Sequence, residues 1–186
     1  MGSEMCIRDR LCSIPKVVIS HWHRDHYGGL LGLIRECPKV EKVYAPSMWR
    51  VVKEIERLNV GFVECKSKRQ VYNYVIASGP IYSSREQVLK VKVKDLGVLI
   101  FTGCGHAGIS NILRWVVKSG ERVYGIIGGI HVRRDFCESP EKIAKLFKEL
   151  NIEKLVLLHH KFKRGPLRRL LSDYIVDCGV GSILKF

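Results

Sequence analysis

Short apolar runs alternate with stretches of helical periodicity along most of this chain of 186 residues. The first apolar run, at 16–19, is rich in β-branched residues, which favours a buried strand. Residues 29–37 have the pattern of a helix that Pro38 ends, and 47–58 carry apolar residues at helical spacing. Further strands are predicted at 40–45, 60–64, 71–76, 87–93 and 97–101.

The second half of the chain alternates more regularly between strand and helix. We predict helices at 109–118, from 139 onward and at 166–176, and strands at 122–127, 154–158 and 182–186. Ser139 and Pro140 suit the N-cap and the first turn of the middle helix. This length and this alternation predict one α/β domain with a substantial core.

A dense group of metal-ligand side chains follows the first predicted strand. Within six positions the sequence places His21, His23, Asp25 and His26. Imidazole and carboxylate are ligand types that zinc, iron and manganese use. Because His21 and His23 alternate in an extended segment, they point the same way, and a following turn can direct Asp25 and His26 toward a second ion. We therefore predict that this loop supplies half of a two-metal site.

Three further histidines come just after predicted strands, namely His106, His131 and His160. A single histidine in such a place is usually structural, but the recurrence beside the first motif makes all three candidate ligands. His159 competes with His160 for this role. Cys104 either binds metal or is a small residue in a tight Gly-Cys-Gly turn.

Three motifs carry a resemblance to a known family. They are His-Trp-His-Arg-Asp-His at 21–26, Thr-Gly-Cys-Gly-His-Ala-Gly-Ile-Ser-Asn at 102–111 and Gly-Gly-Ile-His at 128–131. The first matches the H-x-H-x-D-H signature, so the chain resembles the metallo-β-lactamase superfamily. The other two, with Glu-Gln-Val-Leu at 86–89, resemble its subgroup of dihydropterin–ribofuranosylaminobenzene phosphate synthase-like proteins.

The resemblance implies a four-layer αββα sandwich and a metal-dependent hydrolase with two divalent ions. Zinc is the first expectation, with iron and manganese as alternatives. The ions would share a bridging hydroxide that attacks a phosphorus or carbonyl centre, and Asp25 would orient this nucleophile. The implied ligands of the first ion are His21, His23 and His106. Those of the second are Asp25, His26 and a C-terminal histidine, for which His160 is the first candidate.

The chain departs from the family pattern in several places. Many members carry a bridging Asp where this chain has Gly-Gly-Ile-His, so we expect His131 to replace it. The last motif begins His160-Lys161, where the subgroup has His-Cys-Thr-Gly. Members also carry strands ahead of the first motif, and residues 1–10 lack any apolar period. We therefore expect a non-native leader at 1–10 and a domain at 11–186 whose first sheet is incomplete.

The formal net charge of +14 is high for this length. Arg133, Arg134 and Lys161 lie beside candidate ligands, which predicts a basic rim that binds a small anionic substrate, a phosphoester or a pterin-related phosphate. Two alternatives stay open. The charge favours a nuclease on the same fold, and the missing Asp favours a metal-poor binding or sensor protein.

Cysteine usage and apolar runs bear on the compartment. The seven cysteines are scattered and odd in number, which predicts reduced thiols rather than a disulfide framework. No apolar stretch approaches the roughly 18 residues of a membrane-spanning helix. Both features favour a cytoplasmic protein. The sequence does not identify the substrate, the metal or the oligomeric state.

Overall fold

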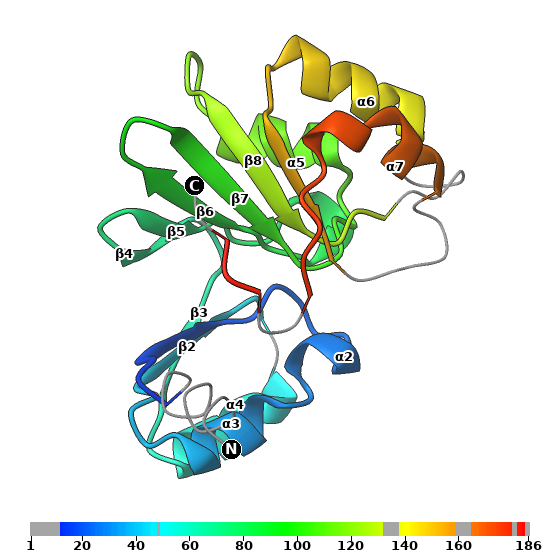
Figure 1. Cartoon of the computed structure of the whole chain (residues 1–186). Coiled ribbons are helices and arrows are strands. Elements are labelled where there is room, and N and C mark those ends of the chain that lie inside the picture. Colours follow the sequence, from blue (N-terminus) through cyan, green and yellow to red (C-terminus); the bar gives the residue numbers. More distant parts are fainter. Residues whose placement is uncertain (1–11, 48, 132–137, 159–164, 180–181, 185–186) are drawn as a thin grey trace.

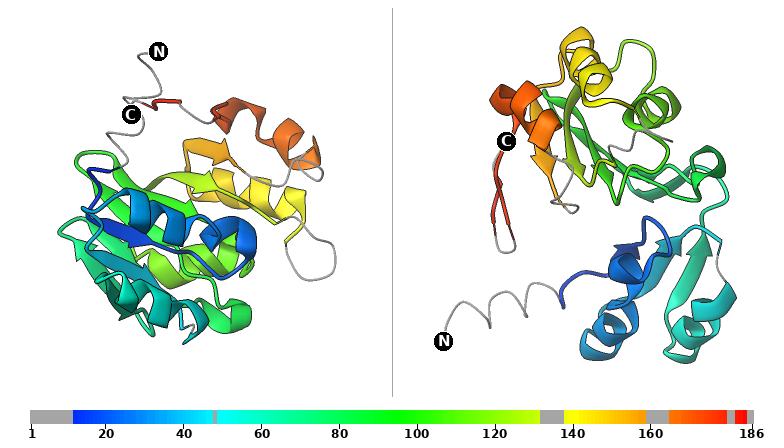
Figure 2. Two further views of the ribbon diagram at one scale, coloured as in Figure 1. Left: turned by 90° about the horizontal axis from the view of Figure 1, so that it is seen from below. Right: turned by 90° about the vertical axis from the view of Figure 1, so that its right-hand side faces the viewer.

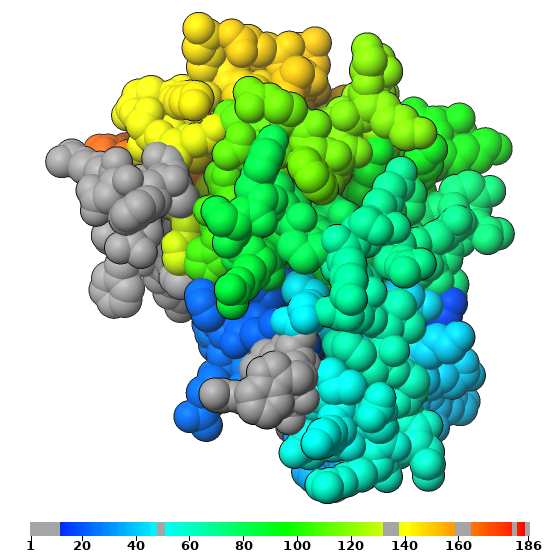
Figure 3. Space-filling view, turned by 180° about the vertical axis from the view of Figure 1, so that it is seen from behind, coloured from blue at the N-terminus to red at the C-terminus, as the bar shows by residue number. Residues whose placement is uncertain are grey.

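The computed structural model describes residues 12–47, 49–131, 138–158, 165–179 and 182–184. Two β-sheets lie between two layers of helices, with the first part of the chain in one half and the remainder in the other (Figures 1 and 2). Figure 3 shows from behind that the two halves pack directly against each other. The predicted α/β class and αββα sandwich are confirmed.

The smaller sheet is parallel throughout, in the order β1-β2-β3. Its strands are β1 (Lys16–Val18), β2 (Lys42–Ala45) and β3 (Gly61–Glu64). Helices α2 (Arg24–Tyr27) and α3 (Leu30–Glu36) connect the first two strands, and α4 (Trp49–Arg57) connects the second to the third. The apolar faces of α3 and α4 pack on this sheet, with Ile34 and Ile55 in one buried cluster with Val43.

The larger sheet has the order β4-β5-β6-β7-β8-β9. Its strands are β4 (Arg69–Tyr72), β5 (Val75–Ala77), β6 (Leu89–Val93), β7 (Gly97–Thr102), β8 (Val123–Gly128) and β9 (Lys154–Leu157). The first four run antiparallel, whereas β7, β8 and β9 are parallel, so their carboxyl ends meet at one edge. Two 3₁₀ turns, Tyr82–Ser84 and Ser172–Tyr174, complete the described elements.

Helices α5 (Ile109–Val116), α6 (Pro140–Glu149) and α7 (Gly165–Leu170) cover the outer face of the larger sheet (Figure 1). Phe147, Ile112 and Ile126 belong to the buried cluster between these helices and the sheet. The predicted cap is confirmed, because the Ser139 hydroxyl accepts a hydrogen bond from the Lys142 N–H at 3.2 Å.

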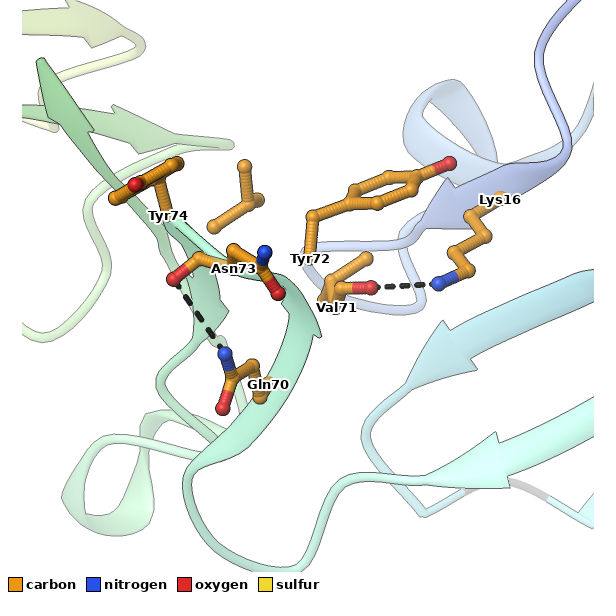
Figure 4. Close-up of a pocket in the computed structure, with 7 residues that line it drawn as sticks. Lys16, Gln70, Val71, Tyr72, Asn73 and Tyr74 are labelled. Atoms are coloured by element: carbon orange, nitrogen blue, oxygen red, sulfur yellow. Dashed lines mark hydrogen bonds between the residues drawn. The ribbon is translucent and has the colours of Figure 1, made fainter.

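Hydrogen bonds join the two sheets close to the end of β1. The Gln87 side chain is buried, and its Nε2 donates to the Ile19 carbonyl at 2.8 Å, while its backbone N–H donates to the Ser20 carbonyl at 2.8 Å. Farther away, the Lys16 ammonium donates to the Val71 carbonyl at 2.7 Å and lies over the Tyr72 ring (Figure 4). The end of β1 is therefore fixed against the larger sheet.

A surface pocket of about 480 Å³ lies beside this Lys16 contact and is drawn in Figure 4. Its lining residues are 16 and 70–75, so it is separate from the candidate metal ligands. No helix within the described ranges is long and apolar enough to cross a membrane.

Four sequence predictions need correction. The strand predicted at 71–76 is a hairpin, because the chain turns at Asn73–Tyr74 between β4 and β5. The helix predicted at 166–176 gives way to a 3₁₀ turn after Leu170, and residues 182–184 form no strand. A disulfide joins Cys12 to Cys37, so the prediction of reduced thiols is wrong for this pair. Their spacing of 25 positions gave no sign that the end of α3 returns to the segment before β1.

Candidate metal centre

The candidate ligands lie where strands of both sheets end. His21 and His23 follow β1, and the loops after β7 and β8 carry His106 and His131. Because β7 and β8 are parallel neighbours, these two loops leave the sheet side by side. The His131 N–H donates to the Cys104 carbonyl at 2.8 Å, which holds the two loops together.

Four of these side chains form a compact cluster. One donor atom each from His21, His23, Cys104 and His106 lies within 4.8 Å of all the others. His21 Nε2 is 3.1 Å from His23 Nδ1. His21 and Cys104 are buried, whereas His23 is exposed, so the cluster extends from the interior to the surface. Three imidazoles and a thiol form a donor set that suits zinc and neighbouring divalent ions.

The remaining predicted ligands flank this cluster. The ring centroid of His26 is 4.2 Å from that of His21, and that of His131 is 4.5 Å from that of His106. The exposed Asp25 carboxylate is 3.6 Å from His26 Nε2. The fold thus brings together six of the seven predicted metal ligands.

Several predictions fall on residues outside the described ranges. They are the ligand His160 and its competitor His159, and the basic-rim residues Arg133, Arg134 and Lys161. The predicted leader at 1–10 is outside these ranges as well.

A buried carboxylate that sequence reasoning did not single out organises the loop after β7. Glu86 is 1% exposed. Its Oε1 accepts hydrogen bonds from the backbone N–H groups of residues 103, 104 and 105, at 3.0, 2.7 and 3.0 Å. Its Oε2 accepts a fourth from the His106 N–H at 2.7 Å. The four N–H groups of this turn thus share one anionic acceptor. A Gly-Cys-Gly-His turn requires such an acceptor, but its sequence does not reveal which residue supplies it.

Close packing also fixes the His21 ring. The Ser20 hydroxyl lies 3.0 Å from His21 Nδ1, which leaves Nε2 directed into the cluster. Gly103 lies so near that a Cβ built on it would be 2.2 Å from the Ser20 hydroxyl and 3.0 Å from the ring. Any side chain at position 103 would therefore displace a candidate ligand.

Burial shifts two pKa values in the cluster. Desolvation and the neighbouring histidines lower the pKa of His21 to about 4, although Glu86 opposes this. His21 is therefore neutral at pH 7, and its lone pair is available to a metal. Burial, and then the negative charges of Glu86 and Asp25, raise the pKa of the Cys104 thiol to about 12. Metal binding through this sulfur would have to displace its proton.

Comparison with known proteins shows which fold this arrangement belongs to. No protein-family model matches the chain. A crystal structure of a metal-dependent hydrolase of the β-lactamase superfamily is 26% identical to this chain, superposes on it with a TM-score of 0.72, and aligns over 91% of this chain and 78% of its own length. This chain has the fold of the metallo-β-lactamase superfamily.

Two further proteins are similar to this chain. The 7,8-dihydropterin-6-methyl-4-(β-D-ribofuranosyl)-aminobenzene-5′-phosphate synthase of Methanocaldococcus jannaschii is 24% identical over 94% of this chain and 76% of its own length. The isothiocyanate hydrolase of Delia radicum gut bacteria shares the fold, with a TM-score of 0.65 and 14% sequence identity. The alignment covers 96% of this chain and 79% of the length of the hydrolase.

The structure explains why neither of the first two positions of the Gly-Gly-Ile-His motif holds an acid. A Cβ on Gly128 would lie 2.0 Å from the Thr102 carbonyl oxygen, and one on Gly129 would lie 2.4 Å from that of Gly103. The loops after β7 and β8 approach too closely for a side chain at either position. The first residue of the motif that carries a potential ligand is therefore His131.

Proposed function

We propose that this protein is a metal-dependent hydrolase that acts on a small anionic substrate. The observation that carries the proposal is the convergence of His21, His23, His106 and Cys104 at the strand ends. A divalent ion bound there would act as a Lewis acid and lower the pKa of water. The shared fold supports the same chemistry, since the similar crystal structure is that of a metal-dependent hydrolase.

Each candidate residue has a role in this proposal. His21, His23 and His106 hold one ion, and Asp25, His26 and His160 hold a second, with His131 as an additional ligand beside His106. The exposed carboxylate of Asp25, whose Oδ2 lies 3.6 Å from His26 Nε2 at the edge of the cluster, orients the attacking group. We propose zinc as the metal, with iron and manganese as alternatives.

The proposed substrate carries a phosphate or a comparable anionic group. The product named for the Methanocaldococcus jannaschii relative is a pterin-linked ribosyl phosphate, which supports this class. The net charge of +14 supports it as well. Arg133, Arg134 and Lys161 are the proposed contacts, so reversing the charge of both arginines should raise KM for a phosphoester. An unchanged KM would remove them from the substrate site.

Metal content tests the proposal directly. Purified protein is analysed for zinc, iron and manganese beside a His21→Ala/His23→Ala variant and a Tyr74→Ala control, whose exposed side chain is on the β4–β5 turn. We expect about two equivalents in the wild type and in the control, and a loss in the double variant. A panel of phosphoesters then tests hydrolysis. Metal near zero after reconstitution would instead favour a non-catalytic binding protein.

A further inference from the structure

Cys104 lies between the two groups of candidate ligands. Its Sγ is 3.1 Å from Nε2 of His26, which the proposal assigns to the second ion. The same sulfur belongs to the cluster of donor atoms within 4.8 Å, together with His21, His23 and His106. Cys104 is 1% exposed, so the thiol faces the imidazoles rather than solvent.

The backbone of Cys104 is held on both sides. Its N–H donates to Glu86 Oε1 at 2.7 Å, and its carbonyl accepts the His131 N–H at 2.8 Å. Steric contact demands glycine at position 103, whereas the two hydrogen bonds that hold residue 104 are made by its backbone and are independent of its side chain. The need for a small residue therefore does not explain why a metal-binding atom is fixed beside three imidazoles.

The charge balance of the site also calls for an anion here. Two divalent ions would bring four positive charges, while the imidazoles are neutral ligands and Asp25 and a bridging hydroxide would supply one negative charge each. Glu86 is directed to four backbone N–H groups, and the close loops exclude an acid at positions 128 and 129. A thiolate at Cys104 would supply the missing negative charge.

We propose that Cys104 is a metal ligand, whose Sγ binds the ion held by His21, His23 and His106 on the side that faces His26. This inference rests on the proposed function, because it requires that the cluster binds metal. It adds a thiolate to a site that the family resemblance describes with histidine and aspartate ligands alone.

Cobalt substitution tests the inference spectroscopically. Metal-free protein is titrated with Co²⁺, and a thiolate ligand produces a charge-transfer band in the near ultraviolet that imidazole and carboxylate do not produce. We expect this band in the wild type and in Cys65→Ser and Cys178→Ser, two free thiols outside the donor cluster. Cys104→Ser should lose the band and bind cobalt at least about tenfold more weakly.

The outcomes separate the inference from the proposed function. If the wild type binds cobalt without the band, or if the band survives in Cys104→Ser, Cys104 is not a ligand, although the hydrolase proposal stands. If the wild type binds no cobalt, both proposals fail together. A wild type that binds cobalt without the band overturns the inference even if Cys104→Ser misfolds, and far-ultraviolet circular dichroism establishes whether this variant has folded.

Discussion

Replacing Glu86 by Gln should weaken both the fold and metal binding, because one buried carboxylate serves four backbone donors. Gln retains a single oxygen, which can keep the three bonds that Oε1 now accepts. Its NH₂ group would then face the N–H of His106, at the place where Oε2 now accepts at 2.7 Å. The substitution converts charge-assisted bonds into neutral ones and leaves one buried donor opposed by another.

The expected size follows from these contacts. A hydrogen bond to a charged group contributes about 1.5–3 kcal/mol, and a buried donor without an acceptor costs about 1–3 kcal/mol. Because Gln also avoids the cost of burying a charge, we expect a net loss of about 2–4 kcal/mol in the free energy of unfolding. The displaced loop carries Cys104 and His106, so zinc affinity should fall about 10- to 100-fold.

Two measurements on Glu86→Gln check this reasoning. Urea unfolding of the metal-free protein gives the stability, and competition with a chromophoric chelator gives the zinc affinity. The matched control is Glu153→Gln, an exposed carboxylate paired with Arg122, which should change stability by no more than about 0.5 kcal/mol. If Glu86→Gln equals this control in both stability and affinity, the carboxylate does not organise the loop.

Three further results are expected. Glu121→Ala should lower the free energy of unfolding by about 2–4 kcal/mol, because it removes the carboxylate that pairs with Lys90, a residue that is 3% exposed. The control Glu149→Ala, which breaks an exposed ion pair, should lower it by about 0.5 kcal/mol or less in the same urea assay. Burial raises the pKa of Glu121, but the Lys118 N–H and the Lys90 ammonium outweigh burial and lower this pKa. The ion pair therefore stabilises the protein above pH 4.5, and its contribution is lost as the pH falls through the lowered pKa. If the difference in stability between the wild type and Glu121→Ala does not narrow in acid, this reasoning is wrong. Gly129→Ala should reduce zinc affinity more than about tenfold by forcing two loops apart, whereas Gly32→Ala, on a helix with open space around it, should leave affinity unchanged.

The sequence was informative wherever the chemistry is local. Apolar runs predicted most strands, and the structure brings together His21, His23, His106 and His131, the candidate ligands that follow strand ends. Parallel pairing explains why His106 and His131 are neighbours, because β7 and β8 end at one edge of the larger sheet. His21 and His23 follow a strand of the smaller sheet, whose end Gln87 holds against the larger sheet.

The features that the sequence did not predict depend on contacts between distant segments. Glu86 precedes the loop that it anchors by 17 to 20 positions, and although the motif at 86–89 contributes to the family resemblance, nothing local shows which groups this carboxylate binds. Cys12 and Cys37 meet only because α3 returns to the start of β1. The strand predicted at 182–186 has suitable residues, but residues 182–184 pair with no sheet strand within the described chain.

The close approach of the loops after β7 and β8 links several of these features. Glycine at 128 and at 129 lets the two backbones come together, and the hydrogen bond from His131 N–H to the Cys104 carbonyl then forms. The same proximity excludes an acidic side chain at these two positions. The Cys104 thiol is fixed by this contact and lies among the imidazoles, so the geometry that removes one anionic ligand also positions its replacement.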